Sequence, residues 1–153
     1  YNVLGLIKGV VTVSNNLFPG TEHIFKNVIR LSEDLYEKYE KTYTEDGMTL
    51  GELFTFTETP AGQEIEKSTQ VLKDYMMTLS FEHVKLLQKI MYLGRDREYD
   101  EHLIVPSEIY NDFLRTFGKE GWNTQEDEVI FMIGKGDLAK NLKDGTKILG
   151  IQL

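Results

Sequence analysis

Apolar residues recur at intervals of three and four along most of the chain, the spacing that places them on one face of an α-helix. The clearest run follows Thr21, which can cap a helix, and Glu22, whose charge suits the positive end of a helix dipole. Its apolar positions are Ile24, Val28, Leu31, Leu35 and Tyr39. We therefore predict one long amphipathic helix that ends near Tyr43.

Four further positions predict helix starts. Thr59 is followed by a proline at the first helical position, Ser80 and Thr124 can act as caps, and Pro106 suits a first turn. The residues expected on the faces of these helices, and of a last segment after Gly136, are Ile65, Leu72, Met76, Leu79, Val84, Leu87, Ile90, Met91, Ile109, Phe113, Leu114, Phe117, Val129, Met132, Ile133, Leu138, Leu142 and Leu149.

Glycines mark the expected helix ends. We predict that Gly94 is a left-handed C-terminal cap, that residues 95–105 form a charged loop, and that Gly118 stops the next helix. Thr49-Leu50-Gly51-Glu52 has the form of a capping box and predicts a short helix through Phe54.

The first 17 residues fit two structures. Val3, Leu6, Ile7 and Val10 have helical spacing, whereas the β-branched run 10–13 and two glycines favour a short strand. No internal repeat or linker interrupts the chain. We therefore predict an all-α fold, a single-domain bundle of five to seven helices over residues 1–153, with this first segment left as helix or strand.

The charge balance narrows the choice of partners. The chain has 25 acidic and 17 basic residues and a net charge of −8, and it contains no cysteine. Thiol chemistry is excluded, and a phosphate backbone or an anionic membrane surface is a poor partner for an acidic protein. The apolar opening is too short for a membrane helix and has no secretory pattern, so we expect a soluble, cytoplasmic protein.

Two groups of polar residues could bind a metal or act in acid–base catalysis. The pairs Glu22-His23, Glu82-His83 and Glu101-His102 are adjacent in sequence, although a helical metal site needs ligands three or four residues apart. The cluster Glu126-Asp127-Glu128 falls in the first turn of a predicted helix, where acidic residues stabilise the helix dipole without catalysis. We expect no metal site, no cofactor and no catalytic residue here.

The segment from Leu93 to His102 is the strongest candidate for binding. Arg95 and Arg97 are two of the four arginines of the chain, and carboxylates surround them. Arginine recognises carboxylate and phosphate groups in a planar, bidentate manner, so Arg95, Arg97 and His102 are candidate ligand-binding residues. The alternative is an internal salt-bridge network that holds the loop to the domain.

This segment also carries a family resemblance. Residues 81–95, which end in Ile90-Met91-Tyr92-Leu93-Gly94-Arg95, resemble a bacterial family of domains of unknown function whose helix has the form L-x-x-L-M-x-L-G-R-G. Residues 128–135, 138–139 and 149–150 are similar to the closing helix pair of that family. The resemblance covers about half the chain, from Leu79 onward, with Asp96 in place of the usual glycine. It implies an all-helical fold and no known activity.

Two functional hypotheses follow. The first is a non-enzymatic protein-interaction or regulatory module that uses aromatic residues near Tyr36, Tyr39 and Tyr43 or around Trp122. The second is a small-ligand or anion-binding protein, or an enzyme, that uses the Arg95–His102 loop. A pocket with side chains converging from this loop and another helix favours the second, and an exposed apolar patch favours the first.

Overall fold

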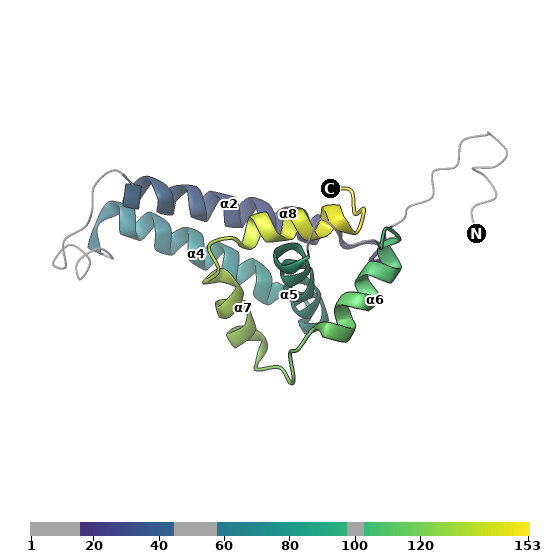
Figure 1. Cartoon of the computed structure of the whole chain (residues 1–153). Helices are drawn as coiled ribbons and strands as arrows, with labels where there is room; N and C mark the ends of the chain where they lie inside the picture. The colour runs from purple at the N-terminus through teal and green to yellow at the C-terminus, as the bar shows by residue number, and fades with distance from the viewer. Residues whose placement is uncertain (1–15, 45–57, 98–102) are drawn as a thin grey trace.

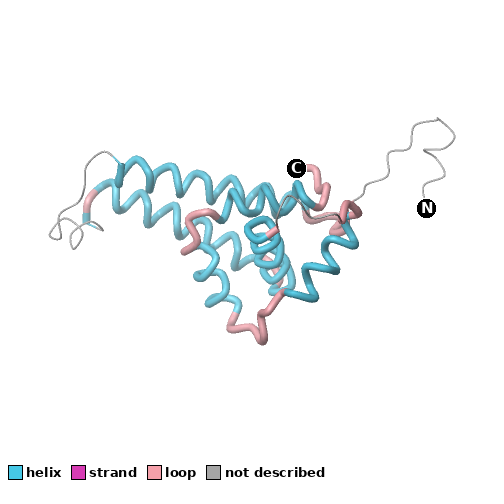
Figure 2. Tube along the Cα trace, viewed as in Figure 1, coloured by secondary structure: helices cyan, strands magenta, loops and turns pink. Residues whose placement is uncertain are grey.

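The computed structural model describes residues 16–44, 58–97 and 103–153. Helix is the only regular secondary structure in these ranges (Figure 2). The helices are α2 (Glu22–Thr44), α4 (Pro60–Thr78), α5 (Phe81–Asp96), α6 (Pro106–Thr116), α7 (Gln125–Ile133) and α8 (Leu138–Ile148). The prediction of an all-α fold with five to seven helices is confirmed.

The helices pack around one another in a fixed pattern. α2 and α4 lie side by side as a long antiparallel pair, and α8 packs against α2 and crosses α5 (Figure 1). α7 packs against both α4 and α5. α6 stands at the side of the molecule (Figure 1), and Ile109 is its one buried residue.

The predicted caps form the helix starts. The hydroxyl oxygen of Thr59 accepts a hydrogen bond from the Gly62 amide at 3.0 Å, and Pro60 occupies the first turn of α4. Ser80 caps α5 in the same way, and Thr124 caps α7. Each of these bonds satisfies one amide that the helix itself leaves without a partner.

One hydrophobic core draws residues from all six of these helices. The helical residues in it are Ile24, Phe25, Val28, Ile29, Leu72, Met76, Val84, Leu87, Ile90, Met91, Leu93, Ile109, Val129, Met132, Leu138 and Leu142. Most of the predicted core positions are among them. Leu114 was expected on the buried face of α6 but is exposed, and Phe117 lies just past Thr116, the last residue of that helix.

The prediction of a left-handed cap at Gly94 is wrong. α5 continues through Asp96, so that Gly94, Arg95 and Asp96 are helical and the charged loop begins later than expected. Gly94 instead lies where α5 crosses α8, against the backbone carbonyl of Asn141. Because the two helices approach so closely, this position has no room for a side chain.

The left-handed glycine cap occurs at the end of α8. Gly150 has φ +67°, its amide donates to the carbonyl of Lys147, and the Ile151 amide donates to the carbonyl of Thr146. These two bonds define a Schellman motif.

Three expectations concern other parts of the chain. They are the choice between helix and strand for residues 1–17, the short helix at 49–54 and the position of His102. All three lie outside the described residues, except that residues 16 and 17 of the first segment are described.

Candidate functional site

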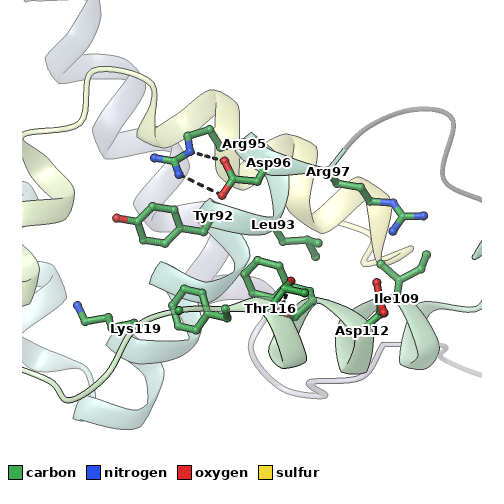
Figure 3. Close-up of a pocket in the computed structure, with 12 residues that line it drawn as sticks. Tyr92, Leu93, Arg95, Asp96, Arg97, Ile109, Asp112, Thr116 and Lys119 are labelled. Atoms are coloured by element: carbon green, nitrogen blue, oxygen red, sulfur yellow. Dashed lines mark hydrogen bonds and ion pairs between the residues drawn. The ribbon is translucent and has the colours of Figure 1, made fainter.

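A cleft of about 400 Å³ separates the last two turns of α5 from α6 (Figure 3). α5 supplies Tyr92 and Arg95 to one wall, and α6 supplies Phe113 and Thr116 to the other. The connection after α6 closes one end with Lys119. The cleft is partly open to solvent, so a ligand could enter without movement of the helices.

Aromatic rings form the apolar surface of the cleft. The ring of Phe117 lies 5.8 Å from that of Tyr92 and 5.2 Å from that of Phe113, measured between centroids. Tilted contacts at such distances stabilise ring pairs beyond simple area burial. Leu93 and Ile109, both buried, lie beneath them. The cleft is therefore lined by a group of aromatic and aliphatic side chains that lies beside its charged residues.

Arg95 is held by its own helix. Its guanidinium donates two hydrogen bonds to the Asp96 carboxylate, at 2.6 and 3.0 Å, and lies 4.5 Å above the ring of Tyr92. The bonds to Asp96 raise the pKa of Arg95. Both side chains are half exposed, so this pair orients Arg95 more than it stabilises the fold.

Arg97 and Lys119 lie at opposite ends of the cleft (Figure 3). Arg97 donates to the carbonyl of Leu103 at 2.8 Å, a bond that joins the end of α5 to the segment before α6. Lys119 pairs with Glu128, away from the cleft centre. The three cations therefore do not converge on one point, and each is bonded to an acceptor of the protein.

The predicted ligand-binding residues are thus brought together only in part. Arg95 and Arg97 both line the cleft, but from within α5 and at its end rather than from a loop. The structure does not describe His102. The wall opposite Arg95, formed by Phe113 and Phe117, was predicted as core. Their i, i+4 spacing was the available signal, but it does not distinguish a core face from a cleft wall.

A buried polar network lies next to the cleft. Glu128 is 1% exposed and Gln88 is fully buried, and the Gln88 side-chain amide donates to Glu128 at 2.8 Å. The Lys119 ammonium donates to both of them. Burial alone raises the pKa of Glu128, but the hydrogen bonds from Lys119 and Gln88 outweigh it and the pKa is lowered. The sequence placed Glu128 in an acidic cluster that stabilises a helix dipole, and its burial was not predicted.

The other polar and aromatic groups weighed from the sequence lie apart from the cleft. Glu126 is exposed and contacts Lys73 at 3.5 Å, so it does not share a site with Glu128. Within residues 16–44, 58–97 and 103–153, no three His, Asp or Glu side chains are arranged to hold a metal ion. Tyr36 and Tyr39 are 40% and 44% exposed on α2. The side chain of Tyr43 is outside the described set.

The half-buried ring of Trp122 supports the Lys119 end of the cleft. It lies 6.4 Å from the ring of Phe117, and the ammonium groups of Lys119 and Lys85 lie 4.3 and 5.6 Å from its centroid. We expect the fluorescence maximum of this single tryptophan to be at shorter wavelength than that of free tryptophan in water, because its ring is removed from part of the solvent. An emission spectrum of the folded protein tests this, and a maximum equal to that of the unfolded chain would contradict it.

Comparisons with known proteins add no functional information. The chain matches no protein-family model, and neither the curated proteins nor the solved structures contain a match. The resemblance of residues 81–95 to a bacterial family therefore stays a prediction. None of the helices in the described ranges has the length and apolar character that a membrane crossing needs.

Proposed function

We propose that the chain is a non-enzymatic interaction module whose cleft between α5 and α6 binds a short segment of a partner protein. The observation that carries this proposal is the aromatic interior of the cleft, formed by Tyr92, Phe113 and Phe117. Rigid aromatic surfaces in partly enclosed pockets are the usual anchors of protein interfaces. One apolar side chain of a partner segment would occupy this surface.

The charges around the cleft favour binding over catalysis. The charged residues that line it are Arg95, Asp96, Arg97, Asp112 and Lys119. Asp96 is bonded to Arg95, and Asp112 accepts a hydrogen bond from Arg115 at 2.7 Å. Acid–base catalysis needs a group free to exchange a proton with a substrate. Paired carboxylates at the rim instead suit hydrogen bonds to a peptide backbone.

The small-ligand alternative has one supporting observation. Side chains from the end of α5 and from α6 do line one cleft, and its volume of about 400 Å³ lies within the range of small-molecule sites. The cations of the cleft, however, face different acceptors, so an anion would meet no focused positive charge. The apolar centre therefore supports a peptide side chain better than it supports an anion.

A substitution that fills the cleft tests the proposal. Thr116 is the last residue of α6, is exposed and lines the cleft. Thr78 is its matched control, because it is the exposed last residue of α4 and its hydroxyl bonds the carbonyl three residues earlier, as that of Thr116 does. We expect a protein that copurifies with the parent and with Thr78→Arg to be lost with Thr116→Arg.

Affinity purification from the native cell with all three proteins, followed by mass spectrometry, is the measurement. Retention of the same partners by Thr116→Arg and Thr78→Arg would contradict binding in the cleft. Equal thermal stability of the two variants shows that any loss is not caused by unfolding.

A further inference from the structure

A second hollow lies on the other side of the last turn of α5, against α8. Its volume is about 470 Å³, and its walls come from the end of α5 and from one face of α8. Four of its seven lining residues are basic and one is acidic. They are Arg95, Arg97, Lys140, Lys147, Asp144, Gly94 and Ile148.

The helix crossing explains why these cations gather. Gly94 and Gly145 allow α5 and α8 to approach with backbone contact, which brings the end of α5 onto α8. Lys140 and Lys147 are seven residues apart in α8, about two turns, so they lie on the same face of that helix. The two lysines therefore stand beside the arginines that end α5.

The group of four basic residues in the hollow contrasts with the net charge of the whole protein, which is −8. We infer that the hollow between α5 and α8 binds the phosphate group of a phosphorylated or diphosphate-containing ligand. A phosphate carries about −1.5 to −2 charges and three acceptor oxygens. It can therefore bind several cations at once better than a carboxylate, which carries a single charge. Arginine and lysine together are the usual residues for such a group.

Two of the cations in the hollow already form ion pairs within the protein, and a phosphate would have to compete with these pairs. Lys140 contacts Asp144 at 2.9 Å and Arg95 contacts Asp96, and the side chains of both pairs are between 42% and 72% exposed. Exposed pairs of this kind contribute little to stability, so a phosphate can compete with the two carboxylates for these cations. In the part of the chain that the structure describes, Lys147 has no ion-pair partner and remains available to a phosphate oxygen.

Arg95 and Arg97 line both the aromatic cleft and the basic hollow, but Lys140 and Lys147 line only the hollow of these two, so the inference can be tested separately from the proposed function. The test is isothermal titration at low ionic strength with inorganic pyrophosphate, inorganic phosphate and acetate as probes. The variants are Lys147→Gln, Lys140→Gln and the double variant. Lys143→Gln is the matched control, since this exposed lysine of the same helix carries the same charge but pairs with Glu33 outside the hollow.

We expect pyrophosphate to bind more tightly than phosphate, and acetate to show the weakest binding. The double variant should bind pyrophosphate at least about tenfold more weakly, because hydrogen bonds to charged groups are lost. Lys143→Gln should bind within about twofold of the parent, since this lysine does not line the hollow and its ammonium is paired with Glu33. Equal binding of acetate and pyrophosphate, absence of pyrophosphate binding, or equal losses with Lys143→Gln and the double variant would each overturn the inference.

Discussion

Replacing Gly94 with alanine is expected to lower the free energy of unfolding by about 3 kcal/mol, at the upper end of the usual cost of overpacking. A Cβ at this position would overlap the backbone carbonyl of Asn141 and lie 2.6 Å from the amide nitrogen of Gly145. Both are backbone atoms, so a side-chain rotation cannot relieve the overlap. The crossing of α5 and α8 would have to open.

Gly118→Ala provides the control for this prediction. Gly118 follows α6, and a Cβ there would meet no atom within 4 Å. Its substitution should change stability by less than about 0.5 kcal/mol, as surface substitutions usually do. Urea unfolding of both variants, monitored by circular dichroism, gives the comparison. If Gly94→Ala is as stable as Gly118→Ala, the close helix crossing is wrong.

The second large effect is expected from Lys119→Met. This substitution would leave the carboxylate of Glu128 buried without its cation, a change that costs about 3–5 kcal/mol when a buried pair is broken. Because the Lys119 side chain is 22% exposed, we expect a loss near the lower end, about 3 kcal/mol. The control is Lys73→Met, which breaks a more exposed pair with Glu126 and should cost at most about 1 kcal/mol.

Two further measurements separate the effect of the buried ion pair on stability from the effect of lost side-chain packing. The double variant Lys119→Met/Glu128→Gln should recover part of the loss, since no buried charge remains. In the parent, the lowered pKa of Glu128 means that its carboxylate contributes stability at pH values above its unfolded pKa. That contribution is lost as the pH falls through the lowered folded value. An acid transition of the same shape for parent and double variant would contradict the assigned role of Glu128.

The features of the fold that local patterns determine could be predicted from the sequence. Thr59, Ser80 and Thr124 act within one turn of themselves, so their capping role depends on few other residues. Gly94 shows the opposite case. A glycine after an amphipathic helix fits both a helix end and a close helix crossing, and the choice depends on Gly145, 51 residues further along the chain.

The candidate site was predictable only as a region. The sequence identified Arg95 and Arg97, which line both the aromatic cleft and the basic hollow. It could not identify the opposite walls of the two sites. Phe113 lies opposite in the cleft and Lys140 in the hollow only because tertiary packing brings α6 and α8 beside the end of α5. The burial of Glu128 was hidden for the same reason, since its cation comes from the connection between α6 and α7.

Site-specific photo-crosslinking in the native cell tests the central claim most directly. A photoreactive phenylalanine analogue at position 116 would lie in the cleft, whereas the same group at position 78 would lie at the end of α4. Binding of a partner segment in the cleft predicts one predominant crosslinked protein at position 116 and none of it at position 78. The same adducts at both positions, or no adduct at position 116, would contradict the account.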